Sequence, residues 1–274
     1  MTTTALPGIA RPETSRPLLP DVVRSEWIKF RTVRSTYWTL FVTVVGMIGL
    51  GALFAFAFVS RYDRLNPIER LTFNATTHSL RGFFMAQLAV GVLGVLIVTS
   101  EYSTGSIRAT LAAVPQRRTV LIAKSLVFTA VMAVLGIASS FGAFFVGQAI
   151  LSQKGLEAHL SDPGALRSVI GAGLYLTVVG LLSVGLGTMI RRTAGAIATV
   201  VGLLLILPGI VAALPSSWQN VINPYLPSVA GSAIMGSAFG DGRVLSPWAG
   251  FGVFCAYAAA ALVAGAVLLK RRDA

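Results

Sequence analysis

The sequence contains few charged residues for its length. Asp, Glu, Lys and Arg make up 12% of its 274 residues, whereas 55% are hydrophobic. Soluble domains carry roughly 25% charged residues, so this composition excludes an ordinary soluble protein. The charge that remains is unbalanced, with 22 Lys and Arg against 10 Asp and Glu. The basic residues stand at the edges of hydrophobic runs, which is typical of membrane topology and not of a nucleic-acid-binding face.

Cysteine and histidine are also scarce. Cys255 is the only cysteine, which excludes an internal disulfide, a paired-thiol redox site and a cysteine zinc cluster. The two histidines, His78 and His159, do not have the spacing of a zinc-binding motif. The sequence contains neither a G-x-x-x-x-G-K-[ST] phosphate-binding loop nor a G-x-S-x-G nucleophile motif. We therefore predict a protein without a catalytic site, metal or cofactor of its own.

Six hydrophobic segments are long enough to cross a bilayer, which takes about 20 residues at 1.5 Å per residue. They predict an all-α membrane protein, and Pro208-Gly209 in the fifth segment predicts a kink or local unwinding. Small residues recur within the segments and indicate close helix packing. The predicted spans are residues 37–59, 82–99, 120–151, 169–190, 194–214 and 248–269.

The distribution of Lys and Arg predicts that both ends of the chain are in the cytoplasm. With the N-terminus inside, fifteen of the 22 basic residues fall on the inner side and seven on the outer side. Such an excess sets orientation under the positive-inside rule. The first outer loop, which carries Arg61, Arg64, Arg70 and Arg81, is the main exception to the pattern.

The N-terminal region divides into two parts. Residues 1–18 are polar and rich in Thr and Pro, which predicts a disordered cytoplasmic tail. Residues 19–35 place their hydrophobic side chains on one side of a helix, which predicts an amphipathic helix at the inner membrane surface. Glu26 falls within the hydrophobic stripe, so it either pairs with Arg108, Arg117 or Arg118 or remains hydrated among the headgroups. Residues 36–274 form the predicted six-helix transmembrane domain.

The loop between the second and third spans is long and basic. It begins at Glu101, turns at Gly105, continues as a short helix-compatible run and is interrupted by Pro115 before Arg117-Arg118. An inner loop that only reverses the chain needs a few residues. This loop therefore has the length and charge of a docking surface.

This loop resembles the glutamate–glycine–proline–arginine–lysine signature of type-2 ABC exporter permeases, E-x-x-x-G-[ST]-[IL]…P-x-x-R…K. Residues 25–34 and 190–197 are similar to the family's N-terminal interfacial helix and to its short inner loop between the fourth and fifth spans. Residues 214–231 are similar to the segment before the last span in members from high-GC Gram-positive bacteria. The positions that match the signature are Glu101, Gly105, Ser106, Ile107, Pro115, Arg118 and Lys124.

The resemblance implies a six-helix permease subunit in a bacterial cell membrane. A second permease subunit would complete a dimer, and a separate ABC ATPase would supply the energy for export of a lipophilic or amphipathic substrate. It also implies a partly re-entrant outer segment at about residues 215–247. The residues that would dock or couple the ATPase are Glu26, Lys29, Arg31, Glu101, Gly105, Arg108, Pro115, Arg117, Arg118 and Lys124.

The membrane segments contain neutral polar residues that would either line a substrate path or hydrogen-bond between helices. They are Gln87, Ser139, Gln148, Tyr175 and Thr177. Three other functions remain open from the sequence: a membrane-embedded enzyme, a secondary transporter or channel, and a non-transporting membrane partner of an ATPase. Membrane lipid is an expected partner and nucleic acid is not.

Overall fold

The computed structural model describes residues 18–236 and 244–271, and within these ranges the chain is helical and has no strand. It confirms the predicted all-α class with six candidate membrane-spanning helices. The predicted disordered tail falls, apart from Leu18, outside the described residues. The helical spans are Arg34–Arg64, Ala75–Ser103, Arg117–Lys154, Ala165–Ile190, Thr193–Ala212 and Pro247–Arg271.

Most helices begin earlier or end later than hydropathy alone predicts. The spans are built on α2 (Arg34–Arg61), α5 (Phe83–Ser103), α7 (Arg117–Leu151), α8 (Ala165–Ile190), α9 (Thr193–Val201) with α10 (Leu207–Ala212), and α13 (Pro247–Arg271). Polar residues can continue a helix beyond the bilayer core, and a hydropathy window does not register them. With 35 residues, α7 is about 50 Å long at 1.5 Å per residue, so it extends past a hydrocarbon core of about 30 Å.

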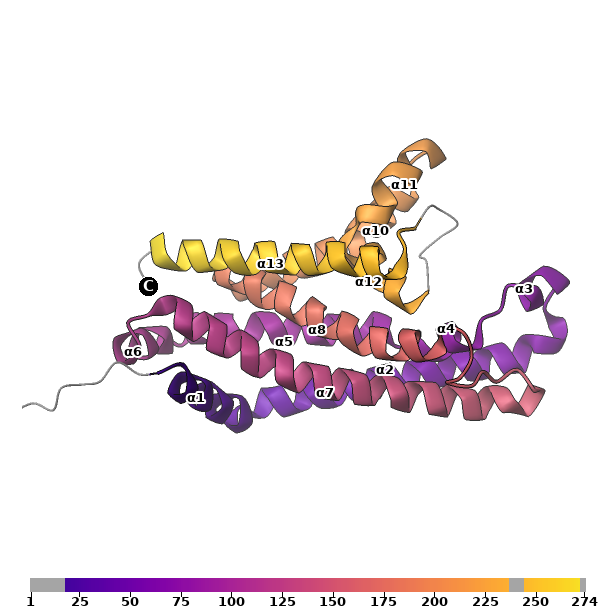
Figure 1. Ribbon diagram of the computed structural model, residues 1–274, viewed down its shortest axis with the longest axis horizontal. Helices are drawn as coiled ribbons and strands as arrows, with labels where there is room; N and C mark the ends of the chain where they lie inside the picture. The colour runs from indigo at the N-terminus through magenta and orange to yellow at the C-terminus, as the bar shows by residue number, and fades with distance from the viewer. Residues whose placement is uncertain (1–17, 237–243, 272–274) are drawn as a thin grey trace, which may run out of the picture.

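Helix α8 is the centre of the bundle, and α5, α7 and α13 pack along it (Figure 1). In α8, 78% of the most hydrophobic stretch is buried, against 22% in α2 and 22% in the α9–α10 span. Glycines allow the close packing: a Cβ on Gly173 would lie 2.5 Å from the backbone nitrogen of Ile137 in α7. A Cβ on Gly185 would lie 2.7 Å from the carbonyl carbon of Ala261 in α13. The predicted packing through small residues is therefore seen at this central helix.

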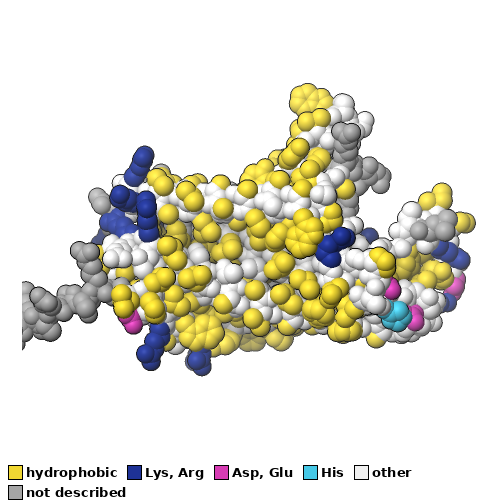
Figure 2. Space-filling model, viewed as in Figure 1, with side chains coloured by type: hydrophobic (Ala, Val, Ile, Leu, Met, Phe, Trp, Pro, Cys, Tyr) yellow, Lys and Arg dark blue, Asp and Glu magenta, His cyan; other side chains and the backbone are white. Residues whose placement is uncertain are grey.

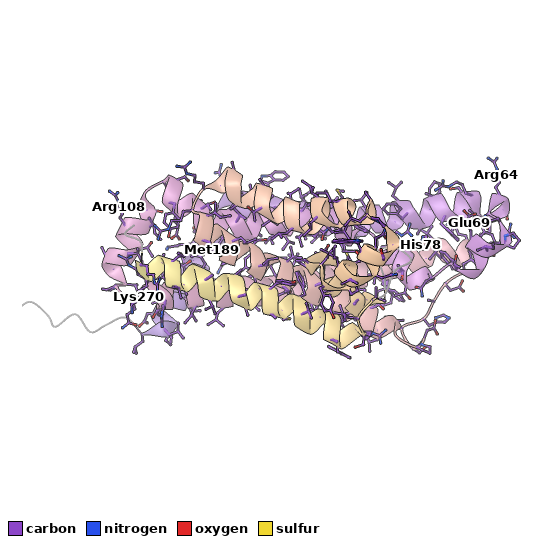
Figure 3. The ribbon with its side chains drawn as sticks, turned by 90° about the horizontal axis from the view of Figure 1, so that it is seen from above. Arg64, Glu69, His78, Arg108, Met189 and Lys270 are labelled. Atoms are coloured by element: carbon purple, nitrogen blue, oxygen red, sulfur yellow. The ribbon has the colours of Figure 1, made fainter. Side chains whose placement is uncertain are left out.

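The bundle has two distinct ends. Helix α1 (Leu19–Thr32), helix α6 (Ser106–Ala113) and the last turn of α13 lie together at one end (Figure 1). Short helices α3 (Pro67–Leu71) and α4 (Ala75–Leu80) lie toward the other. Figure 3 likewise places Arg108 and Lys270 at the first end and Arg64 and Glu69 at the second. We call the first the α1/α6 end and the second the α3 end.

The N-terminal helix is shorter than predicted. It ends at Thr32, Val33 has extended backbone angles, and α2 begins at Arg34. The hydrophobic side of α1 packs partly on protein, because Val22 is buried against Val120 and Ala123 of α7. Leu19 and Trp27 remain about 40% exposed, so they are available to a membrane surface.

The fifth span is irregular just before Pro208, as predicted. Residues Gly202–Ile206 form a π-helical turn (η3) between α9 and α10. Proline has no N–H to bond the carbonyl four residues earlier, here that of Leu204, and its ring crowds that carbonyl. Prolines and single π-turns are both established causes of a bend in a helix. Beyond it, α10 and α11 (Ser216–Ile222) rise away from the other helices (Figure 1).

The chain then folds back onto the bundle. Residues 223–225 form a 3₁₀ turn (η4), followed by α12 (Pro227–Ser232) and the 3₁₀ turn η5 (Ala233–Met235). Every residue of α12 and η5 is buried, and the two contact α13 and α8. The Ser168 hydroxyl donates to the Met235 carbonyl at 2.7 Å. The described part of the predicted outer segment thus includes a stretch enclosed by the bundle.

The arginines of the first predicted outer loop lie near the α3 end, where two of them contact aromatic rings. The Arg70 guanidinium lies 4.8 Å from the Tyr62 ring centroid, and that of Arg81 lies 5.6 Å from the Phe54 centroid. Lys154, after α7, pairs with Asp63 in the 3₁₀ turn η1 (Tyr62–Arg64) at 2.8 Å. Part of the positive charge that runs against the predicted orientation is therefore neutralised or stacked locally.

Candidate functional site

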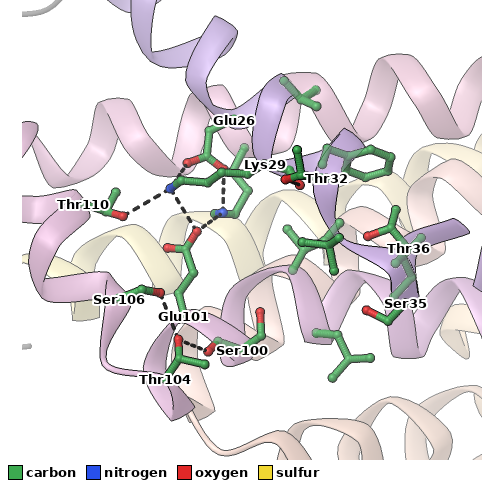
Figure 4. A pocket seen from close by; sticks show the side chains of 17 residues that line it. Glu26, Lys29, Thr32, Ser35, Thr36, Ser100, Glu101, Thr104, Ser106 and Thr110 are labelled. Atoms are coloured by element: carbon green, nitrogen blue, oxygen red, sulfur yellow. Dashed lines mark hydrogen bonds and ion pairs between the residues drawn. The ribbon is translucent and has the colours of Figure 1, made fainter.

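Four charged side chains meet at the α1/α6 end. They come from three helices: Glu26 and Lys29 from α1, Glu101 from α5 and Lys124 from α7 (Figure 4). We call these four residues the ion cluster. Lys124 Nζ lies 2.6 Å from Glu26 Oε2 and 2.9 Å from Glu101 Oε1. Lys29 Nζ lies 2.8 Å from Glu26 Oε1 and 3.2 Å from Glu101 Oε1.

Local sequence explains how the four residues converge. Glu26 and Lys29 are three positions apart on α1, so they lie on the same helix face. Gly105, with a φ of +72°, ends α5 by reversing the chain into α6, a conformation that glycine adopts without steric penalty. That reversal brings Thr110 of α6 to Lys29, whose Nζ donates to the Thr110 hydroxyl at 3.2 Å. The cluster therefore joins α1, α5, α6 and α7.

The cluster is buried and electrically balanced. Glu26 is 4% exposed and Lys124 7% exposed, and two carboxylates face two ammonium groups. Burial alone would raise the pKa of Glu26, but Lys124 and Lys29 outweigh it and hold that pKa below its usual value. Burial alone would lower the pKa of Lys29, but Glu26 and Glu101 outweigh it and raise that pKa. Glu26 and Lys29 are therefore both charged at neutral pH.

Around the ion cluster, the α1/α6 end carries exposed positive charge (Figure 2). Arg31, Arg108 and Arg118 are exposed, as are Gly105 and Pro115. Arg117 is half-buried and donates through Nη1 to the Leu269 carbonyl of α13 at 2.9 Å. We call the exposed residues Arg31, Arg108, Pro115 and Arg118 the basic surface.

The predicted docking residues therefore divide into two groups with different environments. Glu26, Glu101 and Lys124 are buried within this chain, and Lys29 is half-buried, so they hold helices to one another. The basic surface is accessible to another protein. The predicted role of both groups in docking or coupling an ATPase stays a prediction.

The structure corrects the expected partner of Glu26. The sequence suggested an arginine, Arg108, Arg117 or Arg118, or else hydration among headgroups. Glu26 instead pairs with Lys124 and Lys29. Lys124 lies two turns inside α7, so its side chain reaches the buried face of α1, whereas Arg108 and Arg118 lie on the exposed side of the loop. Thr110 was not anticipated, and only its three-dimensional position reveals its role.

The neutral polar residues proposed for a substrate path are all buried and hydrogen-bonded within the chain. Tyr175 donates to Gln87 Oε1 at 2.5 Å, which links α8 to α5. Gln148 Nε2 donates to the Ser79 hydroxyl at 2.9 Å, which links α7 to α4. The hydroxyls of Ser139 and Thr177 donate to carbonyls of their own helices, those of Gly136 and Gly173. These contacts agree with the helix-bonding alternative, and the substrate path stays a prediction.

The chemistry available at these sites is limited. Among the described residues, no group of three or more His, Cys, Asp or Glu could hold a metal ion. In the ion cluster, each carboxylate is bonded to ammonium groups. The ion cluster is therefore suited to joining helices firmly. The basic surface beside it is accessible to another protein.

A bundle of six hydrophobic helical spans defines a multi-pass membrane protein. The sequence matches the family described as ABC-2 family transporter protein over residues 22–274. Because the match covers nearly the whole chain, the protein belongs to this family of type-2 ABC transporter permeases. Membership implies a membrane transport component that works with an ATPase. No protein with a curated description matches the sequence.

Proposed function

We propose that this chain is the permease subunit of an ATP-driven exporter in a bacterial cell membrane. Two permease subunits form the export path, and a separate ABC ATPase docks on the basic surface. In this arrangement both ends of the chain, and with them the α1/α6 end, lie in the cytoplasm. The observation that carries the proposal is the adjacency of an accessible basic surface to a buried ion cluster that ties α1 to α5 and α7.

The ion cluster gives docking a mechanical consequence. An ATPase that displaces α1 also displaces Glu26 and Lys29, which are bonded to Lys124 and Glu101. One that displaces α6 moves Thr110, which is bonded to Lys29. Separating buried ion pairs is costly, so α5 and α7 follow the movement. Because α5 and α7 both pack along α8, the movement reaches the centre of the bundle. Nucleotide state on the ATPase would in this way bias the bundle between inward- and outward-facing forms.

The exposed hydrophobic surface of three spans supports the proposal of a second permease subunit. The α2, α9–α10 and α13 spans expose large hydrophobic side chains, among them Trp38, Phe41, Ile206, Ile210 and Val263. Lipid covers part of this surface, and a second subunit would cover another part. A path between subunits that share such faces suits a lipophilic or amphipathic substrate.

A co-purification experiment tests the docking proposal. The chain is co-expressed with its partner ATPase, and the amount of ATPase retained in detergent is compared between the wild type and Arg118→Glu. We expect the charge reversal to weaken retention about tenfold, which corresponds to about 1.4 kcal/mol. Arg64→Glu, at the α3 end, is the matched control and should retain the ATPase fully. Equal losses in the two variants would contradict docking at the α1/α6 end.

A transport assay with reconstituted protein distinguishes the proposed ATP-driven exporter from a secondary transporter. Proteoliposomes that hold the permease and the ATPase should move substrate only when ATP is present. Transport by the chain alone along an ion gradient would instead identify a secondary transporter.

A further inference from the structure

A pocket of about 380 Å³ lies at the α3 end, between α2, α3 and α4. Cavities of roughly 300–1,000 Å³ are the size that proteins use for small molecules. Figure 3 shows two of the residues that line it, Glu69 and His78. Its apolar wall includes Phe54 of α2, and its charged residues include Arg61 and Arg81.

The two arginines lie over the same side of α2. The Arg81 guanidinium lies 5.6 Å from the Phe54 ring centroid, and Arg61 Nε donates to the Ala57 carbonyl at 3.2 Å. Phe54 and Ala57 are three positions apart, so they share one face of the helix, about 4.5 Å apart along its axis. Two cationic groups are thus held side by side on the wall of the pocket.

Both arginines retain hydrogen-bond donors that no protein group uses. Arg81 is half-buried, contacts the Phe54 ring and forms no hydrogen bond within the described part of the chain. Arg61 uses only its Nε–H. A guanidinium that stacks on a ring still presents its N–H groups in its own plane. The pocket therefore offers several charged donors to an acceptor from outside the chain.

The acidic residues nearby do not supply that acceptor. Asp63 pairs with Lys154 at 2.8 Å. Glu69 lines the pocket, but its Oε2 accepts from the Asn66 backbone N–H at 3.1 Å, and among the described residues it forms no ion pair. Two arginines against one carboxylate leave the pocket with a net positive charge, which favours an anion.

The position of the pocket along α2 indicates where that anion comes from. From Arg34 to Arg61, α2 is about 40 Å long at 1.5 Å per residue, and a bilayer with its headgroups is about 40–45 Å thick. A helix of this length that crosses the bilayer has Arg61 at the level of the headgroups and Phe54 about 10 Å deeper. Leu53 and Phe56 are 57% and 59% exposed, so this part of α2 is open to lipid chains.

We propose that the pocket binds the phosphate group of a membrane phospholipid between Arg61 and Arg81, with an acyl chain along Phe54 and the exposed surface of α2. Guanidinium groups bind phosphate oxygens through paired N–H groups. Such a role accounts for two of the arginines that run against the positive-inside pattern. In the orientation proposed above the lipid belongs to the outer leaflet, whereas the binding itself requires no ATPase.

Native mass spectrometry of the full-length chain in detergent tests the phosphate. We expect dioleoylphosphatidylglycerol to be retained at least about tenfold more than dioleoylglycerol, which has the same chains and no phosphate, because hydrogen bonds to charged groups are the stronger ones. The double variant Arg61→Gln/Arg81→Gln should reduce this ratio to near one. Arg64→Gln/Arg167→Gln, which removes the same charge from exposed arginines outside the pocket, is the matched control. A ratio near one in the wild type, or equal ratios in the two double variants, would overturn the proposal.

A second pair of variants tests the pocket with both arginines in place. Ala57→Trp fills the pocket and should lower the ratio, whereas Phe56→Trp, at the neighbouring exposed position, should leave it unchanged. Equal ratios in these two variants would contradict binding inside the pocket. Excess inorganic phosphate should not displace the phospholipid, because the free ion makes no contact with the apolar wall. Displacement by inorganic phosphate would assign the site to the free ion and overturn the lipid as its occupant.

Discussion

At the scale of single residues, the charged side chains of the ion cluster attract one another, and removing any one of them is costly. A buried ion pair adds modest net stability when intact, but loss of one partner leaves a charge in a poorly solvated place. Glu26 and Lys124 are the most deeply buried members. Their effects on stability should therefore depend strongly on each other.

We predict that Lys124→Met lowers the free energy of unfolding by roughly 3–5 kcal/mol, because it leaves the buried carboxylates of Glu26 and Glu101 with one ammonium group, that of Lys29, instead of two. Glu26→Gln should be similarly harmful. The double variant should be less harmful than the sum of the two, because it removes both ends of the shortest pair. Thermal unfolding in detergent measures all three. Strict additivity would show that the two residues do not act as a pair.

The same cluster should set the pH range of stability. The pKa of Glu26 is lowered in the folded protein, so its contribution is present above the ordinary pKa of 4.5 and is lost as the pH falls through the folded value. The pKa of Lys29 is raised, so its contribution is full below the ordinary pKa of 10.5 and is lost as the pH rises through the folded value.

We therefore expect the contribution of Glu26 and Lys29 to the melting temperature to be nearly constant from about pH 5 to about pH 10 and to decline outside that range. Glu26→Gln should flatten the acid decline, since the variant has no carboxylate at this position to protonate. An acid decline of the same size in the variant would assign it to other carboxylates.

At the scale of helices, the sequence predicted which segments form spans better than where they end. The lengths of the hydrophobic segments identified all six spans, and Pro208 correctly indicated that the fifth span is irregular. The extra turns of α7 and α2 were missed because charged residues such as Arg117 and Arg34 begin these helices. The short helix after Gly105 and its end before Pro115 were predicted from turn chemistry and are confirmed as α6.

The contents of the candidate site were less predictable. The helical period of α1 shows that Glu26 lies on a hydrophobic face, but it does not show which helix covers that face. Its partner Lys124 is 98 positions away in the chain, and the choice between a lysine and three arginines depends on how deeply α7 extends beside α1. Tertiary packing decided the pairing.

The close contact between α7 and α8 gives a test at this scale. A Cβ on Gly173 would lie 2.5 Å from the Ile137 backbone nitrogen, so Gly173→Ala must force the two helices apart. We expect a loss of about 1–3 kcal/mol in the free energy of unfolding. Gly49→Ala in α2 is the matched control, because nothing lies within 4 Å of its added Cβ. It should stabilise by about 0.5–1 kcal/mol, and equal effects would contradict the proposed packing.

At the scale of the whole molecule, the uneven burial of the spans implies that the functional unit is larger than one chain. We predict that native mass spectrometry of the purified complex gives two permease subunits with bound ATPase. Arg118→Glu should release the ATPase without separating the permease subunits, because Arg118 is on α7 and not on the exposed faces of α2 and α9–α10. A single permease chain that still stimulates ATP hydrolysis would contradict the dimer.

The balance of two acids and two bases in the ion cluster has an electrical consequence. Moving one elementary charge through a membrane potential of 100 mV involves about 2.3 kcal/mol of work, but a cluster without net charge does no such work when it moves as a unit. The other buried polar residues proposed for the path, such as Gln87 and Tyr175, are uncharged amide and phenol groups. The cluster itself should therefore add no dependence on membrane potential to movements of the bundle.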